Sequence, residues 1–228
     1  MGKPEFLELL TFHLGPLYIG TTVLTTWLLM AGLTGLAWFG TRRLSLASPT
    51  RLQTAFEGTV LALQAAIDGA APGYAARLLP FIGTLWLFVG AANLAGLVPG
   101  LSSPTGNLSV TVALAMLVFV SVHWFGIRID GLRAYLRHYL EPNPILLPFH
   151  LMGELTRTLA LAVRLFGNMM SLEMAALLVL LVAGFLAPVP LLMLHIVEAL
   201  VQSYIFGMLA LVYVASALQS HELKKRSD

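Results

Sequence analysis

The chain has 228 residues, of which 58% are hydrophobic and only 11% are charged, whereas a typical soluble domain has about 25% charged residues. This composition excludes an ordinary soluble domain and predicts a polytopic membrane protein. The formal net charge of +2 gives no footprint for nucleic-acid binding, and the absence of cysteine excludes disulfides, thiolate metal sites and a cysteine nucleophile.

Three apolar runs in the first part of the chain each have about the 20 residues that a membrane-spanning helix needs. They predict spans at residues 18–39, 78–97 and 108–127. Arg42 follows the first span and Arg128 follows the third, so the positive-inside rule places those ends in the cytoplasm and the N-terminus outside. No basic stretch precedes the first span, and we therefore expect no cleavable signal peptide.

Other segments are typical of short amphipathic helices at a membrane surface. Residues 3–13 and 131–140 have this character. In residues 49–71 the polar side chains fall largely on one helix face, and they are Arg51, Glu57, Gln64 and Asp68. That pattern fits either an interfacial helix or a cytoplasmic helix packed on the bundle.

The last third of the chain predicts a helical hairpin. Residues 145–186 are apolar for about 40 residues, which is too long for one perpendicular span. They form either two short helices or one long helix that is strongly tilted or even parallel to the membrane. A break at Gly184 to Pro190 separates them from a last helix at 188–220, and the basic tail after it places both ends of the hairpin in the cytoplasm.

Together these segments predict an all-α membrane protein with about five membrane helices and short surface helices. Residues 1–228 are expected to form a single integral membrane domain.

The hairpin concentrates ionisable and amide side chains at membrane depth, where such groups indicate function. They are Glu154, Arg157, Arg164, Asn168, Glu173, His195, Glu198 and Gln202. The central one is Arg164, because a guanidinium in hydrocarbon costs about 2.5–3.5 kcal/mol. It cannot avoid that cost by losing its proton. A carboxylate and an imidazole can exchange protons near neutral pH, whereas arginine acts as a fixed positive charge.

Helical spacing predicts how these groups are arranged. Arg157, Arg164 and Asn168 share one helix face, and Glu173 lies on the opposite face about 13 Å further along. His195, Glu198 and Gln202 share a face of the last helix.

The register of the two arms depends on the position of the turn. A turn centred near Gly184 places Glu173 level with His195, and Arg164 level with Gln202. A turn centred near residue 187 slips this register by about one helical turn.

Several of these residues also have purely structural interpretations. Arg157 can extend to the cytoplasmic interface or pair with Glu154, three residues before it. Glu173 and His195 can satisfy each other. Asn168 and Gln202 can serve as ordinary hydrogen-bond links between helices.

Two runs carry a resemblance to a known family. Arg164-Leu-Phe-Gly-Asn168-Met and His195-Ile-Val-Glu-Ala-Leu-Val-Gln202 resemble the last helices of subunit a of rotary F-type ATP synthases, over about residues 145–220. The resemblance implies that Arg164 is the family's essential arginine. It implies half-channel or interface roles for Asn168, Glu173, His195 and Gln202, and it leaves the role of Glu198 open. Glu154 and Arg157 are candidates for the cytoplasmic half-channel.

The resemblance implies a stationary subunit with two ion half-channels. These lead to and from the carboxylates of a rotating c-ring and couple ion flow to ATP synthesis or hydrolysis. The expected partners are the c-ring, the peripheral-stalk b subunits, the lipid bilayer of a bacterial inner membrane and, indirectly, the soluble F1 ATPase. No cofactor, metal or nucleic acid is expected, and the chain is not an enzyme by itself, since it has no phosphate-binding loop or nucleophile triad.

Two alternatives accompany this prediction. The chain has Thr158, Ala160 and Leu172 where the family commonly has Pro, Ser and Gly, and it resembles the sodium-associated N-type branch, so the ion is a proton or sodium. A secondary ion-coupled transporter with a midplane site is the alternative function, although such folds have broken helices in matched halves.

Overall fold

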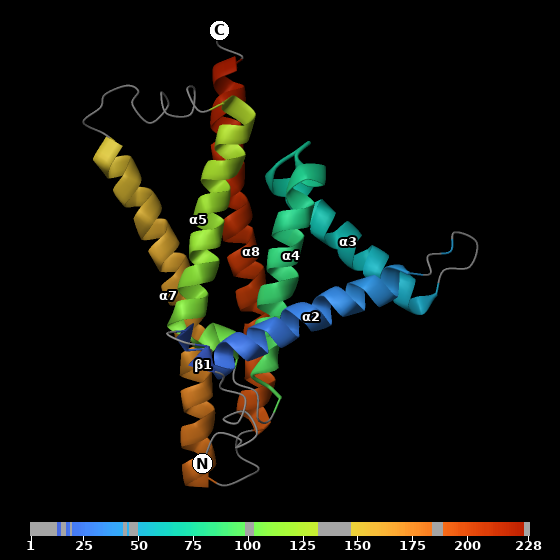
Figure 1. Ribbon diagram of the computed structural model, residues 1–228, viewed down its shortest axis with the longest axis vertical. Coiled ribbons are helices and arrows are strands. Elements are labelled where there is room, and N and C mark those ends of the chain that lie inside the picture. The colour runs from blue at the N-terminus through green and yellow to red at the C-terminus, as the bar shows by residue number, and fades with distance from the viewer. Residues whose placement is uncertain are drawn as a thin grey trace.

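The computed structural model is almost entirely helical over the residues that it describes. These are residues 13–14, 17–18, 20–42, 45, 50–98, 103–131, 147–183 and 189–225. The helices are α2 (Thr21–Thr41), α3 (Arg51–Ala70), α4 (Ala75–Ala95), α5 (Leu108–Asp130), α7 (Leu147–Ala183) and α8 (Val189–Lys225), with a 3-10 turn η1 (Pro104–Gly106) (Figure 1). Two two-residue strands, β1 (His13–Leu14) and β2 (Leu17–Tyr18), pair antiparallel before α2.

Five of these helices are long and apolar enough to cross a membrane: α2, α4, α5, α7 and α8. The all-α membrane fold is therefore confirmed, and α2, α4 and α5 overlap the three predicted spans. The predicted surface segments 3–13 and 131–140 lie outside the described residues, except for the strand residue His13 and for Gly131.

The helix predicted at residues 49–71 is α3, and its C-terminal half packs on the bundle. Ile67 is fully buried, and Leu63 and Ala70 pack against the same apolar core as α4. The N-terminal half exposes Leu52 and Val60. These contacts favour the packed-helix interpretation for the second half of α3, while the proximity of its first half to a membrane surface stays a prediction.

The long apolar segment forms one continuous helix, α7, of 37 residues, and α8 has the same length. At about 1.5 Å per residue each is roughly 55 Å long, whereas the hydrocarbon core is about 30 Å thick. Each helix must therefore tilt or extend beyond the membrane, and the N-terminal part of α7, drawn in yellow, slants towards the other helices in Figure 1. The turn between them, including Gly184, lies outside the described residues.

The core of the bundle lies where α4 meets α8, flanked by α5 and α7. Trp86 of α4 stacks on Tyr204 of α8 at 5.9 Å between ring centres, and its indole nitrogen donates to the Tyr204 carbonyl at 3.1 Å. Gly207 makes this approach possible, because a methyl group there would overlap the Trp86 ring. This close packing fixes the position of α8, and thereby of its polar residues, against α4.

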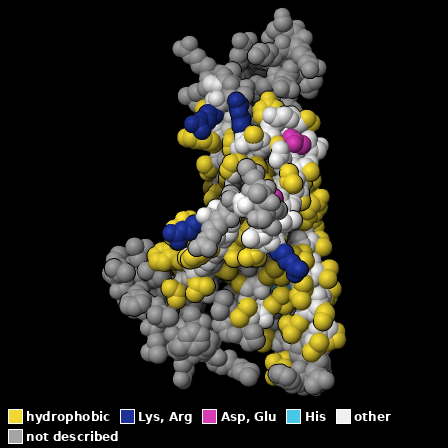
Figure 2. All heavy atoms as spheres, turned by 90° about the vertical axis from the view of Figure 1, so that its right-hand side faces the viewer, with side chains coloured by type: hydrophobic (Ala, Val, Ile, Leu, Met, Phe, Trp, Pro, Cys, Tyr) yellow, Lys and Arg dark blue, Asp and Glu magenta, His cyan; other side chains and the backbone are white. Residues whose placement is uncertain are grey.

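The surface of the bundle is mainly apolar, as a membrane environment requires. Figure 2 shows hydrophobic side chains over most of the described surface in that view, with few charged ones. α2 leaves the bundle sideways in Figure 1, and its side chains such as Trp27, Leu28 and Phe39 are exposed. Lipid is the solvent that suits such a surface.

Candidate functional site

Arg164 lies on the outer surface of α7. Its neighbours Leu161 and Leu165 are buried in the core, so the helix turns Arg164 away from the rest of the chain, and its side chain is exposed. Among the described residues it has no hydrogen bond, ion pair or ring contact. Since this charge is permanent, it needs a partner that the described part of the chain does not supply.

One helical turn after Arg164, an amide pair links α7 to α8. The side-chain nitrogen of Asn168 donates to the side-chain oxygen of Gln202 at 2.7 Å. Gln202 is only 2% exposed, and its own side-chain nitrogen has no hydrogen-bond partner among the described residues. A buried amide that makes half of its hydrogen bonds is costly for structure alone.

The amide pair also fixes the register of the hairpin. The midpoint of residues 168 and 202 is residue 185, which is closer to Gly184 than to residue 187. Gln202 therefore bonds to Asn168, one turn beyond the predicted level of Arg164. The difference arises because the spacing argument compared only heights along the helix axes, whereas the contact also depends on the faces that the helices present.

Glu173 and His195 lie at the opposite end of the hairpin from the basic tail, against the segment that joins α4 to α5. Glu173 accepts from the backbone nitrogen of Ser103 at 3.3 Å, and its carboxylate lies beside Gly106. The His195 side chain is 4% exposed, with Nε2 3.3 Å from the Asn93 carbonyl. These hydrogen bonds go to the backbone rather than from Glu173 to His195.

A buried polar network surrounds these two residues, and the sequence did not identify it as part of the site. Thr105 donates to the side-chain oxygen of Asn93 at 2.7 Å, and Asn93 donates to the Ala199 carbonyl at 3.2 Å. The Ser103 hydroxyl lies 2.7 Å from that of Thr105. The available signal was Asn93, an amide within the predicted span 78–97. Nothing in the spacing shows that η1 folds back onto α7.

Glu198 is half-buried on α8, between His195 and Gln202. No hydrogen bond or ion pair is shown for it among the described residues, so its role stays open. Those residues also include no group of three or more His, Cys, Asp or Glu side chains that could hold a metal ion.

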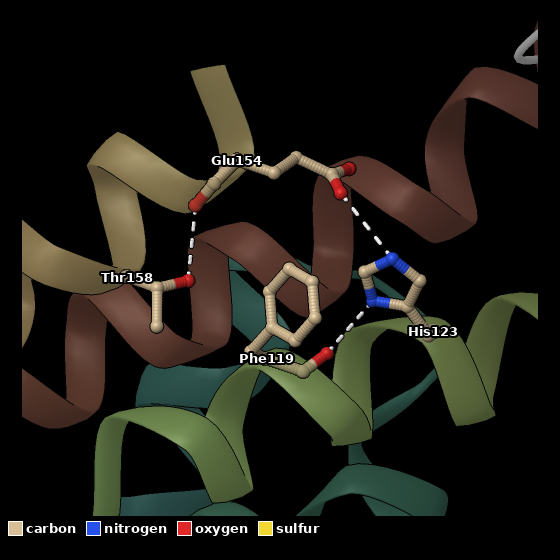
Figure 3. Close-up of polar contacts among 4 residues, drawn as sticks. All are labelled: Phe119, His123, Glu154 and Thr158. Carbon is tan, nitrogen blue, oxygen red and sulfur yellow. Dashed lines mark hydrogen bonds and ion pairs between the residues drawn. The ribbon is translucent and has the colours of Figure 1, made fainter. Parts of the chain in front are cut away.

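A second polar cluster lies towards the N-terminal end of α7. Glu154 forms an ion pair with His123 of α5, at 3.3 Å between Oε2 and Nε2 (Figure 3). Arg157 places its guanidinium over the ring of Tyr213 in α8, 5.8 Å from the ring centre. Arg157 is therefore held across helices by an aromatic ring, an arrangement that the sequence pattern did not predict.

The two clusters flank Arg164. Glu154 precedes it by ten residues and Glu173 follows it by nine, which is about 15 Å and about 13 Å along the helix. The arrangement is thus a permanent, unpaired positive charge between two groups of titratable side chains. The amide pair lies between that charge and Glu173.

Comparisons with known proteins show which proteins the chain resembles. The sequence matches the family described as ATP synthase A chain over residues 23–215, which include all eight polar residues of the hairpin. ATP synthase subunit a 2 of Pelobacter propionicus is 65% identical over 214 residues, covering 94% of this chain and 93% of the relative. ATP synthase subunit a of Legionella pneumophila (strain Corby) is 52% identical over 228 residues, covering 100% and 99%. ATP synthase subunit a 1 of Hahella chejuensis is 64% identical over 207 residues, covering 91% and 88%.

Proposed function

The chain belongs to the ATP synthase A chain family, and from that premise we propose which of its residues carry the ions. It is the ion-channel subunit of the membrane (Fo) sector, a multi-pass membrane protein that is not catalytic by itself. The secondary-transporter alternative is wrong for this chain. Consistent with that, α7 and α8 are continuous helices.

Arg164 is the barrier between the two half-channels. The observation that carries this role is its exposed side chain, without a partner among the described residues, in the middle of a spanning helix. The chemical complement of that charge is a carboxylate on a neighbouring subunit, and the carboxylates of the rotating c-ring supply it. A permanent cation favours the ionised form of a nearby carboxylate and so promotes ion release. The same charge repels ions and prevents a direct leak between the half-channels.

The outer half-channel ends at Glu173 and His195. Their positions against the buried hydroxyl and amide groups of Ser103, Thr105 and Asn93 support this role. A path for ions through a membrane protein needs polar side chains that can exchange hydrogen bonds with water. Asn168 and Gln202 continue the path from Glu173 towards Arg164, and the Gln202 nitrogen, which has no partner among the described residues, is available to bond water.

The cytoplasmic half-channel begins near Glu154 and Arg157, at the other end of α7. The basic residues Arg128 and Lys225 support the orientation. Arg128 lies in the last turn of α5 and Lys225 is the last residue of α8, and the positive-inside rule places both in the cytoplasm. The N-terminus is then outside, and the membrane is a bacterial inner membrane. Each charge that crosses contributes about 2.3 kcal/mol per 100 mV of membrane potential. The soluble F1 ATPase receives this energy through rotation of the c-ring, while the b subunits hold this chain stationary.

The test is Arg164→Ala in the complete ATP synthase, reconstituted in vesicles. We expect loss of ion-driven ATP synthesis, because no permanent charge then separates the half-channels. Val163→Ala shortens the adjacent exposed side chain and is the matched control, with synthesis retained. Synthesis retained in Arg164→Ala would refute the role of Arg164. The same vesicles, assayed for ATP hydrolysis with and without sodium, distinguish proton from sodium coupling.

A further inference from the structure

The ion pair between His123 and Glu154 joins α7 of the hairpin to α5, a membrane helix outside the hairpin. His123 lies on α5 and reaches across to Glu154 of α7, as Figure 3 shows. A second hydrogen bond orients the ring, since Nδ1 lies 2.9 Å from the Phe119 carbonyl. Phe119 also packs its ring against the imidazole at 4.3 Å between centres. The imidazole is therefore held in one orientation, with Nε2 3.3 Å from the Glu154 carboxylate.

This geometry settles which ring nitrogen carries a hydrogen. A backbone carbonyl can only accept, so Nδ1 must donate to Phe119 and bears a proton. The other nitrogen, Nε2, is then either bare in the neutral ring or protonated in the imidazolium.

The contact with Glu154 requires one further proton. A bare Nε2 and an ionised carboxylate would present lone pairs to each other, which is repulsive at 3.3 Å. Two forms avoid this repulsion, namely imidazolium with carboxylate and neutral imidazole with carboxylic acid. Both carry one proton, on Nε2 or on the carboxylate, and the 3.3 Å contact is an ion pair without the alignment of a hydrogen bond. The pair is thus a site for a single proton, whose loss would break the contact between α5 and α7.

The Glu154 oxygen that faces the imidazole is buried, but both side chains are partly exposed. The side chains of His123 and Glu154 are 27% and 25% exposed, in contrast to the buried His195. Arg157 follows Glu154 by three residues on α7 and Arg128 follows His123 by five residues on α5. Their guanidinium groups lie over the rings of Tyr213 and Trp124, respectively. Tyr213 is the titratable residue that α8 contributes next to Arg157.

We propose that His123 and Glu154 form a one-proton store in the cytoplasmic half-channel, which makes His123 a further residue of the ion path. The proposal rests on the function proposed above and commits to the proton as the ion. A proton released by a ring carboxylate reaches the Glu154 carboxylate and gives the two-proton form, imidazolium with carboxylic acid. One proton then leaves to cytoplasmic water and restores the one-proton pair. In ATP-driven pumping the same steps run in reverse.

The test uses variants that keep the contact but change its proton chemistry. In Glu154→Gln the amide can still donate to Nε2, and in His123→Gln the amide can still donate to the carboxylate. A purely structural link therefore survives in both. The readout is passive proton flux through vesicles that contain the complete ATP synthase, after removal of the soluble F1 portion, between about pH 6 and pH 8. Assembly is checked beforehand by co-purification with F1 and the ring.

We expect each glutamine variant to lower passive proton flux about tenfold or more. His123→Gln should also flatten the pH dependence of the flux, because a glutamine side chain, unlike an imidazole, cannot bind and release a proton. Thr158→Ala is the matched control and should stay within about twofold of wild type. Its hydroxyl binds the backbone carbonyl of Glu154 at 3.0 Å and does not contact the carboxylate (Figure 3).

Three results would overturn the store. In the first, the Glu154→Gln and His123→Gln complexes both assemble and keep the proton flux and pH profile of wild type within about twofold. The pair would then be a structural link. The second is a flux carried by sodium and indifferent to pH. The third is failure of both variants to assemble, because a pair whose geometry glutamine preserves would then act in folding. The proposed function is refuted by a different result, which is retention of ATP synthesis by the Arg164→Ala complex.

Discussion

The amide pair of Asn168 and Gln202 is either a structural link between helices or part of the ion path. Apolar substitutions distinguish these two roles, because each role predicts a different effect on stability and on ion pumping. Gln202→Leu removes the acceptor of the 2.7 Å hydrogen bond and leaves the Asn168 nitrogen without a partner. It also removes the Gln202 nitrogen, which has no partner among the described residues. The second change offsets part of the first, so we expect a cost near the lower end of the about 1–3 kcal/mol for an unsatisfied buried group.

Asn168→Leu should cost more. It leaves both polar atoms of the Gln202 amide unsatisfied in a side chain that is 2% exposed, and we expect about 2–3 kcal/mol. The double variant Asn168→Leu, Gln202→Leu leaves no amide group of this pair without a hydrogen-bond partner. Its stability should therefore return to within about 1 kcal/mol of wild type, as replacement of both partners by apolar groups can be nearly neutral.

The two assays are applied to the complete ATP synthase. Heat-induced release of this chain from the complex measures stability, and ATP-driven ion pumping in vesicles measures the ion path. If Asn168 and Gln202 conduct ions, the double variant regains stability but not pumping, because two leucines cannot bond water. A double variant that regains both would show that the pair is a structural link and would refute its place in the path.

Two further predictions concern packing and register. Gly207→Ala should destabilise the bundle by about 1–3 kcal/mol, because its methyl group overlaps the Trp86 ring; heat-induced release measures this, and Gly58→Ala, which meets nothing within 4 Å, is the control. An unchanged Gly207→Ala complex would show that α4 and α8 are less closely packed. Cysteines replacing Asn168 and Gln202 should form a disulfide on mild oxidation, detected by gel mobility. Faster crosslinking of residue 168 to a position one turn further along α8 would move the turn towards residue 187.

Patterns local to one helix were readable from the sequence. Apolar length predicted the spans, and the cost of a permanent charge in hydrocarbon singled out Arg164. The sequence could not choose between one helix and two for residues 145–186, because both satisfy the same apolar run. α7 resolves this as a single helix, whose 37 residues require tilt or protrusion.

Contacts between segments that are distant in the sequence could not be predicted from the sequence pattern. The sequence offered Arg157 as a partner for Glu154, since residues three apart share a helix face. The structure instead pairs Glu154 with His123 and places Arg157 over Tyr213. Both contacts depend on how α5 and α8 pack against α7. Periodicity within one helix carries no information about that packing.

Arg164 is exposed whereas Glu173 and His195 are partly or fully buried, and the reason is that only the latter two can lose their charge. Glutamate and histidine can become neutral, so the fold can bury them partly or fully against α4 and η1, as it does with Glu173 and His195. Arginine cannot, so burying it inside the chain would demand a permanent internal counter-charge. Such a counter-charge would cancel the positive field that a passing carboxylate must meet. The fold therefore leaves Arg164 on its surface, and in the proposed mechanism a ring carboxylate that arrives there offsets part of the about 2.5–3.5 kcal/mol cost of an arginine in hydrocarbon. On this reasoning the isolated chain is less stable in a bilayer than the chain on its ring. Arg164→Leu should then stabilise the isolated chain and abolish ion-driven ATP synthesis, an outcome measurable by thermal unfolding in lipid nanodiscs beside the vesicle assay.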